Sequence, residues 1–185
     1  MLIWQVWGEP PEKRFLISLR PIKGHDVLIE AVRKLRARHP DIATHVLIVG
    51  DGVLRAAYEK ASEALPISFA GFRPDVEWLY RAADVYCQPS RSEGLPNAVI
   101  EAMCSGLPVV ASDVGGMREL VSHANGVLVR PVDSEDLANG VASLLSKPEC
   151  LSDMGKASLS LSERFAVERM VAQYVAAYRE ATGVV

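Results

Sequence analysis

The chain has 185 residues, of which 49% are hydrophobic and 23% are charged, and its formal net charge is −3. This length and composition are typical of a single folded domain with a substantial core, and they exclude a disordered chain. The slightly negative charge excludes a general electrostatic attraction to nucleic acid or to an anionic membrane surface.

Short apolar runs alternate with helical patterns along the chain. The first run, Arg14–Leu19, is followed by apolar residues at helical spacing from Val27 to Leu35, and this pattern stops at Pro40. Further strands are predicted at 45–49, 67–70, 84–88, 108–112 and 126–130. Further helices are predicted around 53–64, 76–82, 97–105, 117–122 and 134–147.

The strands in this series are short and mostly apolar on both faces, which predicts a parallel sheet covered by helices on both sides. Right-handed crossovers between such strands favour a doubly wound arrangement. We therefore predict an α/β fold, a Rossmann-like doubly wound parallel sheet of about six strands with helices on both faces.

The end of the chain has a helical pattern over residues 149–181, with Phe165, Met170, Tyr174 and Tyr178 at helical spacings. We interpret these four side chains as packing anchors, because such a stripe more often serves a core than a cofactor. The predicted organisation is a lead-in at 1–13, one Rossmann-like domain at 14–164 and a C-terminal helix at 165–185.

The most informative segment follows the fourth predicted strand, where Glu93 and Glu101 flank a Gly-x-Pro-Asn sequence that opens a helix. Ligands of open α/β sheets bind at the carboxyl ends of strands, near the point where strand order reverses. Pro96 fits a first helical position, and the free amides of Leu95–Ala98 can receive a phosphate oxygen. Gly94 permits close approach of the backbone to a ligand.

The two glutamates add hydroxyl-binding groups to this anion site. With Asn97 in the first helical turn, Glu101 lies one turn further along and can accept hydrogen bonds from ribose hydroxyls. Glu93, in the loop, can accept them from a sugar, so the segment suits a sugar attached to a diphosphate. The alternative from spacing alone is that both glutamates are solvated surface charges, with Gly and Pro as helix punctuation.

Other features indicate no further chemistry. Gly50-Asp51-Gly52 follows a strand, but Arg55 occupies the place of the third glycine of a dinucleotide fingerprint, so a plain turn is the better interpretation. The loop Ser112–Gly116 either faces the ligand through Glu119 or simply turns the chain. The histidines show no metal-ligand spacing, and no Asp-x-Asp element is present, so we predict no metal.

The cysteines and the start of the chain indicate the cellular compartment in which the protein is expected. The three cysteines, Cys87, Cys104 and Cys150, lack CxxC spacing and are interpreted as reduced, partly buried thiols. Residues 1–11 have no signal-peptide pattern, and no apolar run reaches membrane-spanning length. We expect a cytoplasmic protein, and peripheral contact with the inner membrane face is left open.

A series of short motifs runs through the segments Ala83–Asn97, Glu101–Ala102, Gly106–Ala111 and Gly115–Glu119. This series resembles the group 1 (family 4) retaining glycosyltransferases. Their signature is two glutamates separated by seven residues in an EGxPN…EA…G-PVVA context. The similarity continues through 126–129 and 133–137, and it covers about residues 14–181.

The resemblance implies one lobe of a GT-B fold, which has two Rossmann-like lobes and holds the nucleotide sugar in the C-terminal one. The N-terminal, acceptor-binding lobe is absent from this sequence, so the chain is expected to be a piece of a longer protein or a separate subunit. Residues 165–181 resemble the segment that crosses back to the other lobe, and its apolar side, with Trp4 and Trp7, is a predicted docking surface.

The resemblance also implies roles for single residues. Glu101 would bind the ribose, and Glu93 would face and orient the donor sugar. The backbone amides for phosphate and sugar would come from the segment Gly94, Leu95, Pro96 and Asn97. Arg20 and Lys23 would neutralise the diphosphate by charge-assisted hydrogen bonds. This sequence departs from the commoner family pattern, in which the Arg follows a Gly and lies further from the Lys. The alternative to a diphosphate-binding role is that Arg20 and Lys23 are ordinary solvated cations.

Gly71 and Arg73, after the third strand, resemble the loop that borders the base. The predicted function is therefore the donor-binding lobe of a retaining glycosyltransferase that uses a UDP-sugar or a GDP-sugar and no other cofactor. Glu93, Arg20 and Lys23 are the expected catalytic residues, and the acceptor is a glycan, a lipid or another molecule. The isolated chain is expected to lack full activity.

Two alternatives stay open. The chain could be a non-catalytic nucleotide-sugar-binding module that acts with a partner chain. A sugar-nucleotide epimerase of related architecture is the other alternative, against which the EGxPN series argues. We expect no nucleic-acid partner, and contact with a membrane only through the missing lobe.

Overall fold

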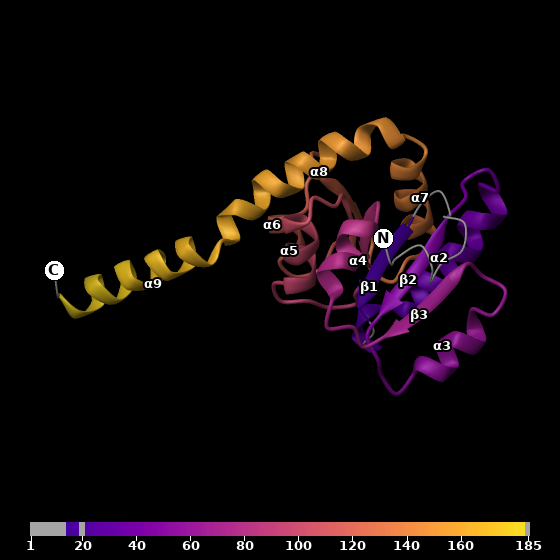
Figure 1. Cartoon of the computed structure of the whole chain (residues 1–185), viewed down its shortest axis with the longest axis horizontal. Coiled ribbons are helices and arrows are strands. Elements are labelled where there is room, and N and C mark those ends of the chain that lie inside the picture. Colours follow the sequence, from indigo (N-terminus) through magenta and orange to yellow (C-terminus); the bar gives the residue numbers. More distant parts are fainter. Residues whose placement is uncertain (1–13, 19–20, 184–185) are drawn as a thin grey trace.

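The computed structural model describes residues 14–18 and 21–183, and its side chains from residue 22 onward. The predicted lead-in at 1–13 therefore lies outside the described residues, as does Arg20. Figure 1 shows a compact α/β body and a helical arm that leaves it at the C-terminal end.

The body is built on one six-stranded sheet in the order β3-β2-β1-β4-β5-β6. All strand pairs are parallel. The strands of the described chain are β1 (Arg14–Ser18), β2 (His45–Val49), β3 (Ile67–Gly71), β4 (Val85–Gln88), β5 (Val109–Ser112) and β6 (Gly126–Val129). Strand order reverses between β1 and β4, which is where such sheets bind ligands. The predicted fold class is confirmed.

Helices connect the strands and cover both faces of the sheet (Figure 1). The first ones are η1 (Pro21–Lys23), α2 (His25–Arg38), α3 (Arg55–Ala61), α4 (Val76–Ala82) and α5 (Asn97–Cys104). They are followed by α6 (Met117–Leu120), α7 (Ser134–Leu145), α8 (Pro148–Ser162), η2 (Glu163–Phe165) and α9 (Val167–Thr182).

Two buried clusters lie on opposite faces of the sheet, because successive strand side chains point to opposite sides. Ile48 and Val85 pack into a cluster with α2 and α7. Tyr86 and Val109 pack into the other, with α4, α5 and α6. Burial of β4 and β5 side chains on both faces explains their continuous apolar runs in the sequence.

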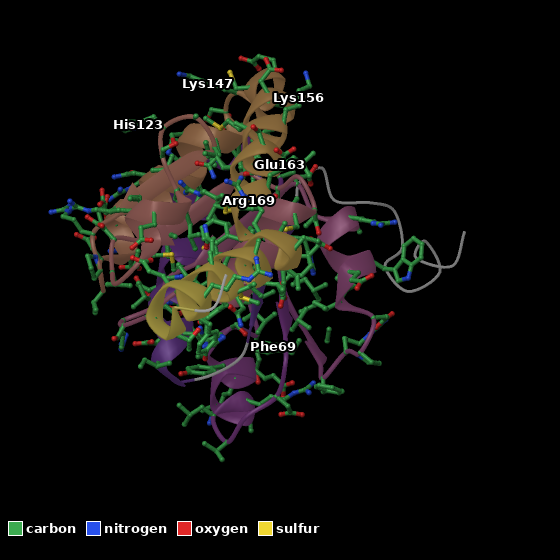
Figure 2. The ribbon with its side chains drawn as sticks, turned by 90° about the vertical axis from the view of Figure 1, so that its left-hand side faces the viewer. Phe69, His123, Lys147, Lys156, Glu163 and Arg169 are labelled. Atoms are coloured by element: carbon green, nitrogen blue, oxygen red, sulfur yellow. The ribbon has the colours of Figure 1, made fainter. Side chains whose placement is uncertain are left out.

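The C-terminal arm begins against the body and then leaves it. Helix α8 packs on α5, where a Cβ on Gly155 would lie 2.3 Å from the carbonyl oxygen of Gly106. The predicted continuous helix is interrupted at η2 and at Ala166, whose ψ of 138° is not helical. Figure 2 labels Glu163, the first residue of η2, and Arg169 in α9.

Helix α9 projects away from the sheet, and none of its residues is buried (Figure 1). Met170, Tyr174 and Tyr178 are 48%, 61% and 69% exposed. Their interpretation as packing anchors is therefore wrong within the described chain, and only Phe165 of that group packs against a core cluster. The reason is geometric, since the chain direction changes at Ala166 and carries α9 beyond the reach of the body.

Two of the cysteines also differ from expectation, because Cys104 and Cys150 are exposed and only Cys87 is buried. Burial raises the pKa of the Cys87 thiol to about 12. Among the described residues, no helix is long and apolar enough to cross a membrane.

Candidate functional site

The candidate site lies at the carboxyl ends of β1 and β4, where the loop after β1 contacts the loop after β4. The N–H of Arg91, after β4, donates to the carbonyl of Ile22, after β1, at 2.9 Å. Gly24 has a φ of +70°, and a Cβ there would lie only 2.0 Å from the carbonyl oxygen of Pro89. This close backbone approach requires glycine, and it brings Lys23 next to the loop that holds Glu93.

Lys23 and Glu93 form an ion pair across 70 positions of sequence, with Nζ 2.5 Å from Oε1. Their side chains are only 14% and 10% exposed. The same oxygen, Oε1, also accepts hydrogen bonds from Ser90 Oγ at 2.6 Å and from Gln88 Nε2 at 2.7 Å. Burial by itself raises the pKa of Glu93, but the hydrogen bonds from Lys23, Ser90 and Gln88 together hold that pKa below its usual range.

Helix α5 starts at Asn97, shortly after Glu93 in the sequence. Pro96 is the preceding N-cap residue rather than the first helical residue. The N–H of Val99 donates to the carbonyl of Pro96 at 3.0 Å, and no side chain of the described structure caps this helix start. An uncapped helix start exposes amide donors and a positive dipole end, which attract an anion.

The loop before α6 holds the backbone at Glu93 and Gly94. The N–H of Gly116 donates to the carbonyl of Gly94 at 2.9 Å. Gly115 has a φ of +54°, and a Cβ there would lie 2.0 Å from the carbonyl oxygen of Glu93. The sequence predicts that this loop either faces the ligand through Glu119 or simply turns the chain. In the structure its backbone supports the segment at Glu93, and the Glu119 side chain is exposed.

Glu101 lies one turn into α5 and is exposed. The Tyr80 hydroxyl of α4 donates to its Oε2 at 3.1 Å. Burial, followed by the charge of Glu101, raises the pKa of Tyr80, so this phenol stays protonated at neutral pH. Both side chains line an open pocket of about 490 Å³ between α4 and α5, which also includes Val76 of α4 and Leu159 of α8.

Gly71 and Arg73 are also predicted site residues, but no described contact joins them to Lys23, Glu93 or Glu101. Gly71 ends β3 with a φ of +67°, and its carbonyl accepts from the N–H of Gly50 at 2.7 Å. Arg73 makes a bidentate ion pair with Asp75, at 2.7 and 2.6 Å. Strand β3 is at the sheet edge, two strands away from β1.

Sequence reasoning missed three contributors to the site, namely Tyr80, Gln88 and Ser90. Two of them stand in the quoted motif, but a buried Gln or Ser in a strand and loop carries no signal of its own. Their role depends on which side of the strand faces Glu93. Within the described ranges, no cluster of three or more His, Cys, Asp or Glu side chains has a geometry that could hold a metal ion.

Comparison with known proteins shows which family the chain resembles in sequence and fold. The family model described as "Glycosyl transferases group 1" matches residues 14–147. An uncharacterized glycosyltransferase of Haemophilus influenzae is 34% identical over 158 residues, which are 82% of this chain and 44% of that protein. A D-inositol 3-phosphate glycosyltransferase of Nocardia farcinica is 35% identical, over 95% of this chain and 42% of that protein.

Solved structures give the same picture. HepE of Anabaena in complex with UDP is 27% identical, with a TM-score of 0.80 over 94% of this chain and 51% of that one. The complex of HepE with UDP-glucose matches with 28% identity and a TM-score of 0.76, over 90% of this chain and 49% of that one. The chain thus spans about half of these proteins or less.

Proposed function

Since this chain belongs to the group 1 glycosyltransferases, we propose that it is the donor-binding lobe of a retaining enzyme. The enzyme transfers a hexose or related sugar from a nucleotide diphosphate sugar to an acceptor. The observation that carries the proposal is the Lys23–Glu93 ion pair at the switch point of the sheet, with the uncapped start of α5 shortly after Glu93 in the sequence.

The proposed mechanism follows the charge that develops when the sugar–phosphate bond breaks. The leaving diphosphate gains negative charge, which Lys23, Arg20 and the start of α5 stabilise. Lys23 has three N–H donors, so it can keep its hydrogen bond to Glu93 and also reach a phosphate oxygen. Glu93 orients the sugar, and Glu101 accepts hydrogen bonds from the ribose.

A UDP-sugar is the first candidate donor, because the similar protein HepE is solved with UDP and with UDP-glucose. A GDP-sugar remains the second candidate. The predicted place of Gly71 and Arg73 beside the base stays part of this proposal. So does a cytoplasmic location, which the absence of disulfide spacing among the cysteines favours.

A second, acceptor-binding lobe completes the proposed enzyme. The chain covers only 44% and 42% of the two relatives named above, which leaves room in those proteins for such a lobe. The exposed apolar stripe of α9, with Met170, Tyr174 and Tyr178, is the surface proposed to contact it.

Calorimetry of the 185-residue chain with UDP, GDP and ADP and with their glucose sugars tests the donor site. We expect binding of one nucleotide class, and a loss of about tenfold or more in affinity for Lys23→Ala and for Glu101→Ala, because each removes a charged hydrogen-bond partner of the ligand. Unchanged affinity in both variants would overturn the site assignment.

The competing function is a nucleotide-sugar-binding module without catalysis that acts with a partner chain. Adding an acceptor lobe from a group 1 relative separates the two. Restored sugar transfer supports the enzyme, and tight donor binding without transfer supports the module. Robust transfer by the isolated chain would contradict the proposed need for a second lobe.

A further inference from the structure

We propose that Tyr86, Gln88 and Ser90 form a positioning network that holds one oxygen of Glu93 and so aims the other at the donor sugar. This inference rests on the proposed function, because it assigns Glu93 to the sugar. None of the three residues is proposed to touch the donor. They act through Glu93, and the claim concerns where its carboxylate points.

The network converges on a single atom. Glu93 Oε1 accepts from Lys23 Nζ at 2.5 Å, from Ser90 Oγ at 2.6 Å and from Gln88 Nε2 at 2.7 Å. No described side chain donates to Oε2 of the same carboxylate. Three short bonds to one oxygen fix the rotation of the carboxyl group, and they leave Oε2 as the acceptor for a ligand hydroxyl.

The Tyr86 hydroxyl determines the orientation of the Gln88 side-chain amide. The Tyr86 hydroxyl donates to Gln88 Oε1 at 2.6 Å, so the amide nitrogen must point the other way, toward Ser90 at 2.9 Å and toward Glu93. Burial raises the pKa of the Tyr86 hydroxyl well above its ordinary value, which keeps it a donor. A reversed Gln88 amide would place its oxygen against the carboxylate of Glu93, and the two acceptors would repel.

Burial makes this arrangement rigid. Gln88 and Ser90 are completely buried, and Tyr86 is nearly so. Each of their polar side-chain groups has a partner within the network, as buried polar groups require. A fully satisfied network in a low-dielectric interior has one low-energy arrangement, so it can hold a functional side chain in a single orientation.

The same aromatic side chain links the two glutamates. The ring of Tyr86 packs edge-on against the ring of Tyr80, with centroids 5.8 Å apart. Tyr80 in turn donates to Glu101. Supports for the sugar-facing and the ribose-facing carboxylates therefore meet in one buried aromatic pair. Removal of only the Tyr86 hydroxyl should disturb Glu93 and leave the ring contact with Tyr80 intact.

The test compares affinity for nucleotide with affinity for nucleotide sugar in the 185-residue chain. The probes are UDP and GDP and their glucose, N-acetylglucosamine and mannose sugars, measured by calorimetry. The variants are Tyr86→Phe, Gln88→Met and Ser90→Ala, each close in size to the native side chain. The quantity of interest is the sugar increment, defined as the affinity for the best sugar nucleotide divided by the affinity for its nucleotide alone.

We expect each variant to lower the sugar increment by about tenfold while nucleotide affinity stays within about twofold, since a hydrogen bond to a charged group is lost. Ser90→Thr, which keeps the hydroxyl, should restore most of the increment. Gln88→Met should have no further effect in a Glu93→Ala background, because the two residues act as one unit. A purely structural role would lower both affinities together.

Ser158→Ala is the matched control, because Ser158 is also fully buried and its hydroxyl donates to the carbonyl of Leu107 at 2.7 Å, away from Glu93. It should lower stability and leave the sugar increment unchanged. An unchanged increment in all three network variants, or no increment in the wild type, overturns the network. Failure of the wild type to bind any nucleotide overturns the proposed function instead.

Discussion

The segment from β4 to α5 and the helix α9 differ in whether their exposed or polar side chains find partners within the described chain. Around Glu93, the side chains of Lys23, Gln88 and Ser90 satisfy the carboxylate within the chain. On α9, an apolar stripe that includes Tyr174 is exposed, and no residue of this helix is buried. The difference is that Glu93 finds its partners within the described chain, whereas the apolar stripe of α9 is left exposed there.

The largest expected effect is on the free energy of unfolding. It tests whether glycine is required at the close contact between the loops after β1 and β4. Gly24→Ala should lower the free energy of unfolding by about 2–4 kcal/mol, because it adds a left-handed strain and a clash with the carbonyl of Pro89. Urea unfolding measures this. Gly94→Ala is the matched control, since a Cβ there meets nothing within 4 Å, and it should change stability by about 0.5 kcal/mol or less. Equal losses in both variants would argue against this requirement for glycine.

The next effect concerns the charge of Glu93. Because its pKa is held below the usual value of about 4.3, its carboxylate stays ionised as pH falls through the range where ordinary glutamates titrate. The stability that this ionised group contributes is present above the unfolded pKa and is lost as pH falls through the lower, folded pKa. The contribution of Lys23 to that shift is tested by Lys23→Met, which removes the cation and should raise the pKa.

We therefore expect the affinity for sugar nucleotide, measured by calorimetry at a series of pH values, to fall at a higher pH in Lys23→Met than in the wild type. Glutamate carboxyl signals in ¹³C NMR give the same pKa directly. Arg130→Met is the control, because Arg130 is exposed and pairs with Asp133 and Asp136 instead. A pH midpoint that does not move in Lys23→Met would contradict the ion pair as the reason for the low pKa.

The smallest effect is expected on α9. Tyr174→Ser should change the stability of the isolated chain by about 0.5 kcal/mol or less, because the side chain is 61% exposed. Leu137→Ala, in the buried cluster with α2, should cost about 2–5 kcal/mol by contrast. Thermal unfolding compares the two, and a large loss in Tyr174→Ser would show that α9 already has a packing partner in this chain.

Addition of an acceptor lobe sharpens the same comparison. Amide hydrogen exchange of α9 should be fast in the isolated chain and should slow when the second lobe is present, because the exposed stripe is then covered. The strands beside Glu93 should show little change. Fast exchange of α9 in both states would argue that its apolar face serves another contact.

The fold was predictable from local pattern because each strand is short, apolar and separated by a helix. The predicted strand at 45–49 coincides with β2, and the predicted helix at 76–82 coincides with α4. The interruption before α9 was not predictable, because no Pro or Gly in residues 163–166 announces it. A helical repeat there continues in sequence although the backbone at Ala166 does not follow it.

The site was only partly predictable, for a different reason. Glu93 and Glu101 could be named because their motif is continuous in sequence. The role of Gln88 could not be assigned, since its neighbours depend on the twist and register of β4 against the loop that follows it. The placement of Lys23 against a glutamate 70 positions away likewise required the folded sheet.

By itself, the sequence determined the alternation of strands and helices, the helix start at Asn97 and the family motif around Glu93, because each of these depends on residues close together in the chain. Only the tertiary structure decided that the side chains of Lys23, Gln88 and Ser90 meet at Glu93 and that α9 is exposed. Those outcomes depend on which distant segments come into contact, and contact between distant segments is set by packing of the whole sheet rather than by any local pattern.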